Sequence, residues 1–196
     1  MNVSLDQFAI EVARITDAGE LVDYVVRVFR EGFGVSLFNF GIYGKLDHFA
    51  RFTDHPTGVA SVMPVEWAER YLAEDHFSRD RAFAHLQFGN GSRCWTSFRE
   101  EEGGDVVMQE VTAFGLSHGL AIPLFGSGYV KAGIMIGGDK LIEAADVRPI
   151  LEAMAVIFHA RFDQIGRQVE RPALSALQLE ILKWMGQGKS KSVIAE

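Results

Sequence analysis

Trp67, Tyr71 and Asp80 are the residues whose types and spacing indicate a binding chemistry. Pro64 favours the first turn of a helix, on which Trp67 and Tyr71, four residues apart, share one face. An indole N–H and a phenol O–H each need a partner when buried, and an ionised carboxylate only accepts hydrogen bonds. If they converge on an apolar wall, these groups would hold a small amphipathic molecule by its polar head, and Trp95 would add another ring.

The same residues also have a purely structural interpretation. A Trp and a Tyr at helical spacing commonly belong to a hydrophobic core, and Trp95 can be one more buried ring. Asp is a preferred N-cap, so Asp80 can simply cap a helix that begins near Arg81. The residue types alone therefore leave a ligand site and a plain core as alternatives.

The order and spacing of these residues resemble the ligand-binding domain of LuxR-type quorum-sensing regulators. The chain carries Pro-x-x-Trp-x-x-x-Tyr, then an Asp that opens a short helix, then a Trp before a Ser/Thr-containing turn. The resemblance implies that Trp67 donates to the lactone carbonyl of an acyl-homoserine lactone and that Asp80 accepts from its amide N–H. Tyr71 and Trp95 would then enclose the head group. We expect four further residues to complete the ligand site: Met63, Phe40, Ile42 and Met135.

The chain also departs from the pattern of that family at the acyl carbonyl of the ligand. Met63 stands where many members have a Tyr, Arg81 follows Asp80 in place of a Pro, and residues 132–136 contain no hydroxyl. A buried carbonyl without a partner costs roughly 1–3 kcal/mol. The alternative function is therefore a sensor domain of the same fold for a different small molecule.

Composition indicates a soluble cytoplasmic protein of one domain, or of one domain and a fragment. The 196 residues are 48% hydrophobic, and the net charge of −7 gives no strong basic field for nucleic acid. The single Cys94 rules out an intramolecular disulfide and fits a reducing compartment. No apolar run reaches the length of a membrane span, and the N-terminus lacks the pattern of a signal peptide, so we expect no membrane association.

Hydrophobic periodicity predicts an α+β fold, an α-β-α sandwich with a central antiparallel sheet of about five strands. The first strand is expected at 35–43, with Phe38, Phe40 and Ile42 on one face and Leu37, Asn39 and Gly41 on the other. The other expected elements are helices near 8–15, 21–29, 64–71, 81–88, 105–114 and 146–168, with strands near 48–53, 93–95, 119–125 and 130–136. Residues 59–63 are either a further short strand or an extended approach to the helix that carries Trp67.

The last residues resemble the start of a LuxR-type helix-turn-helix. Ser175 is a candidate N-cap, Leu179 and Leu182 mark one helix face, and Trp184 precedes a Gly-Lys-Ser sequence as it does in that family. We therefore expect a ligand-binding domain at 1–168, a linker at 169–174, and the N-terminal part of an all-α helix-turn-helix at 175–196.

The sequence ends at Glu196, inside the second helix of that expected motif. Reading a DNA sequence needs contacts to base edges, which the following helix supplies in this family. We expect DNA binding only if the helix-turn-helix is complete. A shortened chain would be a truncated regulator or a natural inhibitor that pairs with a full-length relative.

Enzymatic function is not expected. The six histidines show no metal-ligand spacing, no nucleophile motif is present, and no cofactor other than a small-molecule autoinducer is implied. The apolar stripe of the 146–168 helix, with Phe158, Phe162 and Ile165, predicts a dimer interface, and inward packing of the whole stripe is the alternative. The expected partners are an acyl-homoserine-lactone-like ligand and a second chain, in a homodimer or in a heterodimer with a full-length LuxR-type regulator.

Overall fold

The structure, a computed structural model, describes residues 4–45, 57–101, 104–125 and 130–169. The chain divides into two compact units, residues 1–165 and residues 166–196. Apart from the last turn of helix α7, all the elements below belong to the first unit.

An antiparallel sheet of five strands forms the centre of this unit. The strands are β1 (Val35–Lys45), β2 (Thr57–Val62), β3 (Arg93–Cys94), β4 (His118–Phe125) and β5 (Val130–Gly138). They lie side by side in the order β2-β1-β5-β4-β3, and every neighbouring pair is antiparallel. The predicted antiparallel sheet is confirmed, whereas the strand expected at 48–53 falls outside the described residues.

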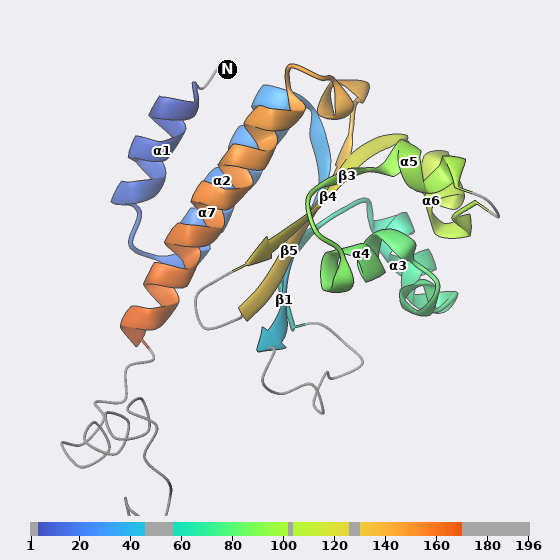
Figure 1. The fold of residues 1–196 in the computed structure, drawn as a ribbon, viewed down its shortest axis with the longest axis horizontal. Helices are drawn as coiled ribbons and strands as arrows, with labels where there is room; N and C mark the ends of the chain where they lie inside the picture. Colours follow the sequence, from blue (N-terminus) through green and yellow to red (C-terminus); the bar gives the residue numbers. More distant parts are fainter. Residues whose placement is uncertain (1–3, 46–56, 102–103, 126–129, 170–196) are drawn as a thin grey trace, which may run out of the picture. The chain divides into compact units, whose positions relative to one another are not determined.

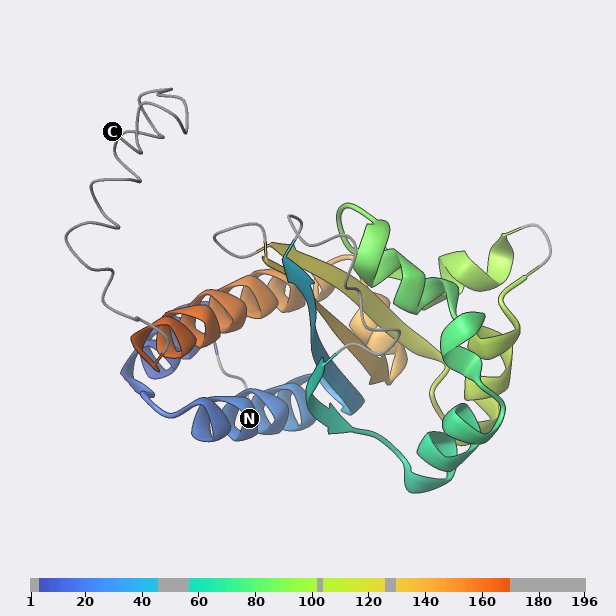
Figure 2. The ribbon, with the colours of Figure 1, turned by 90° about the horizontal axis from the view of Figure 1, so that it is seen from below.

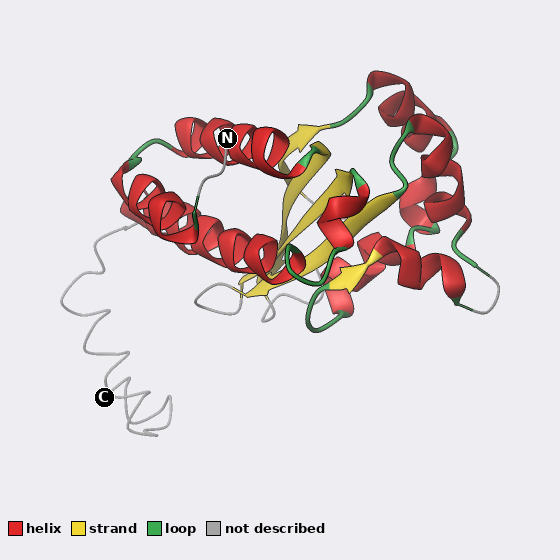
Figure 3. Ribbon diagram, turned by 90° about the horizontal axis from the view of Figure 1, so that it is seen from above, coloured by secondary structure: helices red, strands yellow, loops and turns green. Residues whose placement is uncertain are grey.

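Helices cover both faces of the sheet, so the predicted α+β sandwich is confirmed. On one side of the sheet lie α1 (Leu5–Arg14), α2 (Ala18–Phe33) and α7 (Arg148–Val169), as Figure 1 shows. Four shorter helices lie on the other side: α3 (Val65–Ala73), α4 (Arg81–Phe88), α5 (Trp95–Glu100) and α6 (Val106–Glu110). The views from below and from above show the same division (Figures 2 and 3).

Strand β1 is buried on both faces because successive side chains point to opposite sides of a sheet. Phe38 and Phe40 pack against Phe158 of α7, with ring centroids 6.2 and 5.0 Å apart. Leu37 belongs to a separate cluster on the other face, together with Trp67 and Trp95. The predicted alternation along this strand is confirmed, and it separates a core under the long helices from a second one under the short helices.

The apolar stripe of α7 packs mainly inward, against the sheet. Leu151 and Phe158 are fully buried, and Ile165 is 6% exposed. Phe162 lies 5.0 Å from the ring of Phe40, between centroids. The stripe covers the sheet, so this argument for a dimer was wrong. The helix also begins at Arg148, two residues after the start expected at 146.

Helix α5 is an element that the sequence did not predict, because a distant residue caps it. Cys94, at its N-cap position, makes no side-chain capping bond. Glu143 instead accepts hydrogen bonds from the Thr96 hydroxyl at 2.8 Å and from the Thr96 backbone N–H at 3.3 Å. It also accepts from the backbone N–H of Gly119 at 3.0 Å. Glu143 thereby joins α5 to strand β4.

Replacing Glu143 by Ala should lower the free energy of unfolding by roughly 1–3 kcal/mol, because three partially buried donors lose their acceptor. Urea denaturation measures the change. Glu11→Ala is the matched control, since Glu11 makes only exposed contacts and should cost less than about 1 kcal/mol. Equal effects of the two substitutions would contradict the capping role.

Candidate functional site

A cavity of about 270 Å³ lies between the sheet and the four short helices. Its wall is mainly apolar, with aromatic rings, Met side chains and aliphatic side chains from β1, α3, α4 and the segments between them. Four of the described lining residues carry a polar side chain that is neither indole nor thioether: Asn39, Ser61, Tyr71 and Asp80. An apolar cavity with a few placed polar groups is typical of a small-molecule site.

The structure brings most of the predicted site residues together at this cavity. It is lined by seven of the eight: Trp67, Tyr71, Asp80, Trp95, Met63, Met135 and Phe40. Ile42 does not line it and packs against the core under the long helices, so its assignment to the ligand site was wrong. Phe40 borders the cavity, but its ring packs on Phe158 and Phe162, on the opposite face of the sheet. The strand alternation explains both cases.

Asp80 is a buried carboxylate that has two roles at once. Its side chain caps α4 by accepting the Phe83 backbone N–H at 2.9 Å through Oδ1. Its other oxygen, Oδ2, accepts the Tyr71 hydroxyl at 2.7 Å. Asp80 is only 3% exposed and lines the cavity. The two readings of the sequence, a helix cap and a ligand acceptor, are therefore compatible in geometry.

Burial raises the pKa of Asp80 to about 6. The nearby Asp105 also raises it, while the hydrogen bonds from Phe83 and Tyr71 favour the ionised form and oppose the shift. At neutral pH the group is ionised. A carboxylate offers about four lone-pair sites, so Asp80 can still accept a hydrogen bond from a donor in the cavity.

Trp67 and Tyr71 lie together on α3, as the spacing predicted. Their ring centroids are 5.6 Å apart and the ring planes are inclined by 72°, an edge-to-face contact. Trp67 is 3% exposed, and its indole N–H makes no hydrogen bond to any residue that the structure describes. It is therefore a donor that a ligand carbonyl can use.

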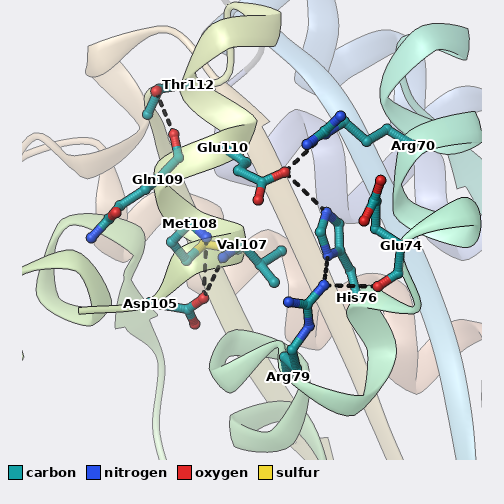
Figure 4. Close-up of polar contacts among 10 residues, drawn as sticks. All are labelled: Arg70, Glu74, His76, Arg79, Asp105, Val107, Met108, Gln109, Glu110 and Thr112. Carbon is teal, nitrogen blue, oxygen red and sulfur yellow. Dashed lines mark hydrogen bonds and ion pairs between the residues drawn. The ribbon is translucent and has the colours of Figure 1, made fainter. Parts of the chain in front are cut away.

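His76 packs against the rings of both Trp67 and Tyr71, a role that the sequence analysis did not predict. The imidazole is fully buried, stacks on Trp67 with centroids 5.5 Å apart, and meets the ring of Tyr71 edge-on. Its Nε2 lies 3.3 Å from Glu110 Oε2, which is ion-pair distance although the angle does not meet hydrogen-bond geometry. Its Nδ1 lies 3.2 Å from Arg79 (Figure 4).

Glu110 links this histidine to helix α3. Its Oε2 accepts Arg70 Nε at 2.8 Å, and this hydrogen bond lowers the pKa of Glu110 (Figure 4). Arg79 also donates to the backbone carbonyl of Glu74 at 2.8 Å. These contacts join α3, the 3-10 helix at His76–Ser78 and α6, and so fix the helix that carries Trp67 and Tyr71.

The indole ring of Trp95 packs against the sheet where strands β4 and β5 each have a glycine. A Cβ atom built on Gly119 or on Gly137 would overlap the indole ring. The two glycines are direct partners on β4 and β5, so together they make room for the ring. The indole N–H of Trp95 is buried without a hydrogen-bond partner in the described part of the chain.

The sequence analysis missed one further polar feature of the wall. Asn39 and Ser61, on neighbouring strands, both line the cavity. Alternation had placed Asn39 on the same face as Leu37, which was the available signal. No cluster of three His, Cys, Asp or Glu side chains that could hold a metal ion occurs among the described residues. None of the described helices is long and apolar enough to cross a membrane.

The fold places a mainly apolar cavity between the sheet and the short helices, and comparison with known proteins gives its family. Residues 19–162 match the autoinducer binding domain. The quorum-sensing-dependent transcriptional regulator RpaR of Rhodopseudomonas palustris is 26% identical over 138 residues. That match spans 67% of this chain and 56% of RpaR, so the chain covers little more than half of that relative.

Solved structures share the fold at low identity. SdiA in complex with octanoyl-rac-glycerol is 16% identical with a TM-score of 0.68, covering 100% of this chain and 82% of that one. CepR2 of Burkholderia cenocepacia, an N-acylhomoserine lactone dependent LuxR family factor, is 15% identical with a TM-score of 0.64, covering 83% and 96%. A free methionine-R-sulfoxide reductase of Neisseria meningitidis is 17% identical with a TM-score of 0.56, covering 84% and 89%.

The chain belongs to the autoinducer-binding domain family, whose model matches most of its length. The resemblance inferred for the ligand-binding domain is confirmed, whereas the helix-turn-helix resemblance falls on residues outside the described part of the chain. The likeness to a reductase shows that the fold by itself does not decide function. The function must therefore be inferred from the side chains that line the cavity.

Asp80→Asn should make the ligand-free protein more stable at neutral pH. The variant keeps an oxygen for the Phe83 N–H but removes the buried charge. The pKa of Asp80 in the folded protein, about 6, exceeds the solvated value of about 3.9. Ionisation of Asp80 therefore lowers the free energy of unfolding of the wild type. This free energy falls as the pH rises from about 4 through about 6, and at neutral pH the decrease is roughly 2–3 kcal/mol.

Urea unfolding of both proteins from about pH 4 to about pH 7 tests this expectation. The stability of the variant relative to the wild type should increase across that range. Asp17→Asn changes the same groups at the exposed N-cap of α2 and is the matched control. A difference between Asp80→Asn and the wild type that does not vary with pH would contradict the buried ionisation.

Proposed function

We propose that this chain is the signal-sensing part of a LuxR-type quorum-sensing regulator and that its cavity binds an N-acyl-homoserine lactone. The observation that carries the proposal is the buried Asp80 carboxylate, held by Tyr71 beside Trp67 in an otherwise apolar cavity. An acyl-homoserine lactone combines an amide N–H, a lactone carbonyl and an apolar chain. Asp80 accepts the N–H, the Trp67 indole donates to the carbonyl, and the apolar wall takes the chain.

The binding role is favoured over an enzymatic one by the same geometry. Asp80 already accepts two hydrogen bonds, and no Cys, Lys or His is found among the described residues that line the cavity. Cys94 is not among the lining residues, and burial raises the pKa of its thiol, which keeps it protonated. The family relatives named above are regulators with signal-binding domains.

A second ligand class is supported by a specific observation. Met63 and Met135 line the cavity and give it thioethers where the resemblance leads one to expect hydroxyl donors. A monoacylglycerol, the type of molecule present in the SdiA structure, has hydroxyl donors and no amide. An ionised Asp80 would accept a hydroxyl as well as an N–H. Acylated glycerol is therefore the alternative ligand.

Dimer formation and DNA binding are proposed only from the family resemblance. The helix-turn-helix motif predicted at 175–196 and residues 170–174 of its linker lie outside the described residues. The α7 stripe, as shown above, is occupied by the sheet. A homodimer, a heterodimer with a full-length regulator, and DNA binding by a complete helix-turn-helix follow from what related regulators do.

Titration of the purified chain with acyl-homoserine lactones of increasing chain length, and with monoacylglycerols of the same lengths, tests the proposed function. A hundredfold excess over the dissociation constant should raise the free energy of unfolding by about 2.7 kcal/mol. Trp67→Phe keeps a ring of similar shape but removes the donor, so lactone binding should weaken by roughly 1–3 kcal/mol. Scanning calorimetry measures the change in stability, and titration calorimetry measures the change in affinity.

Tyr24→Phe is the control, because Tyr24 packs in the core under the long helices and does not line the cavity. It should bind the lactones as tightly as the wild type does. Binding of monoacylglycerols alone would establish the second ligand class. Stabilisation by neither class, or a Trp67→Phe variant that binds as tightly as the wild type, would contradict the proposed function.

A further inference from the structure

Asp105 is a second buried carboxylate near Asp80, and it does not line the cavity. It is 1% exposed and caps α6, because its Oδ1 accepts the backbone N–H groups of Val107 at 2.9 Å and of Met108 at 3.2 Å (Figure 4). Its Oδ2 accepts the backbone N–H of Arg81 at 3.0 Å. One carboxylate therefore joins the first turn of α6 to the first turn of α4.

The contact with Arg81 restrains the backbone directly after the ligand acceptor. Asp80 is the N-cap of α4, so the N–H of Arg81 is the first of the helix and needs a partner from outside the helical hydrogen bonds. Asp80 uses its own side chain for the N–H of Phe83. The N-terminus of α4 is therefore held by two carboxylates, one that lines the cavity and one that does not.

The N–H group that Asp105 binds exists because residue 81 is not a proline. The LuxR-type pattern described above has a Pro after this Asp, and Pro has no N–H to donate. A Pro at the first helical position also fixes φ, a restraint that an Arg does not provide. In this chain the hydrogen bond from Arg81 to Asp105 supplies a restraint at the same place. It acts on the planar peptide unit that joins Asp80 to Arg81, and so limits the rotation of that unit.

We propose that Asp105 is a positioning residue for signal recognition, which sets the direction of the Asp80 carboxylate through the Arg81 peptide. Two restraints then act on that carboxylate: the Tyr71 hydroxyl, 2.7 Å from Oδ2, and the peptide held by Asp105. Asp105 also starts α6, which carries Met108 of the cavity wall, so the acceptor and this part of the wall are tied together. The inference rests on the proposed function, since it takes Asp80 as the acceptor of the ligand N–H.

Asp105→Asn tests the contact with Arg81 selectively. Asn is as good an N-cap as Asp, so its oxygen keeps the two N–H groups of α6 while its NH₂ takes the place of Oδ2. Two donors then face each other at Arg81, and the restraint is lost. Titration calorimetry with N-octanoyl-homoserine lactone at about pH 7.5, where Asp80 is ionised, should show roughly three- to tenfold weaker binding than in the wild type, the effect of one hydrogen bond.

Arg81→Pro separates positioning from a general loss of stability. It removes the N–H that opposes the Asn side chain, and the extended backbone of Asp80, with φ −74° and ψ 105°, permits a following proline. In a chain that already carries Arg81→Pro, Asp105→Asn should therefore change the affinity by less than about twofold. Asp105→Asn also removes a charge near Asp80, but this change occurs in both backgrounds and cancels in the comparison.

Glu101→Gln is the control, because Arg81→Pro also breaks the exposed ion pair between Arg81 and Glu101. It should bind the lactone within about twofold of the wild type. An equal loss from Asp105→Asn in both backgrounds, or no loss in either, would overturn the inference. If Asp105→Asn alone does not fold, recovery of folding and binding with Arg81→Pro supports the inference, and no recovery overturns it. A wild type that does not bind the lactone overturns the proposed function and this inference with it, so the two failures are distinguishable.

Discussion

The burial of one carboxylate, that of Asp80, is the constraint on which the site depends. A charge taken out of water must be hydrogen-bonded, or it becomes protonated. Asp80 receives the Phe83 N–H and the Tyr71 hydroxyl, and its pKa nevertheless rises to about 6. A site poised in this way gains from a ligand that brings one more donor. The same carboxylate also starts helix α4, so the wall of the cavity and its acceptor are built by a single residue.

The surrounding elements keep that acceptor and its aromatic neighbours in place. The buried His76, between Glu110 and Arg79, holds the rings of Trp67 and Tyr71 from behind. Trp95 lies on the sheet where Gly119 and Gly137 leave room for its indole. These contacts fix the positions of the rings that line the cavity, and a fixed wall reduces the entropy that binding must overcome.

The elements that local chemistry determines could be predicted from the sequence. Alternation along β1 correctly separated Phe38 from Leu37, and the cap at Asp80 correctly marked the start of α4. The assignment of Ile42 to the site conflicted with that same alternation. The unpredicted features depend on contacts between distant residues: Glu143 caps α5 across 47 positions, and Ser61 meets Asn39 across 22. The periodicity of apolar residues along the chain does not indicate contacts between residues so far apart in the sequence.

The most direct test of the account is to follow the ionisation of Asp80 by carbon NMR of its carboxyl group, with and without a saturating acyl-homoserine lactone. The account predicts a midpoint near 6 in the free protein. With the lactone bound, the midpoint should fall by about one unit or more, because an N–H donor favours the ionised form. A midpoint that the lactone leaves unchanged, or one near 4 in the free protein, would contradict the claim that Asp80 is the buried acceptor of the signal.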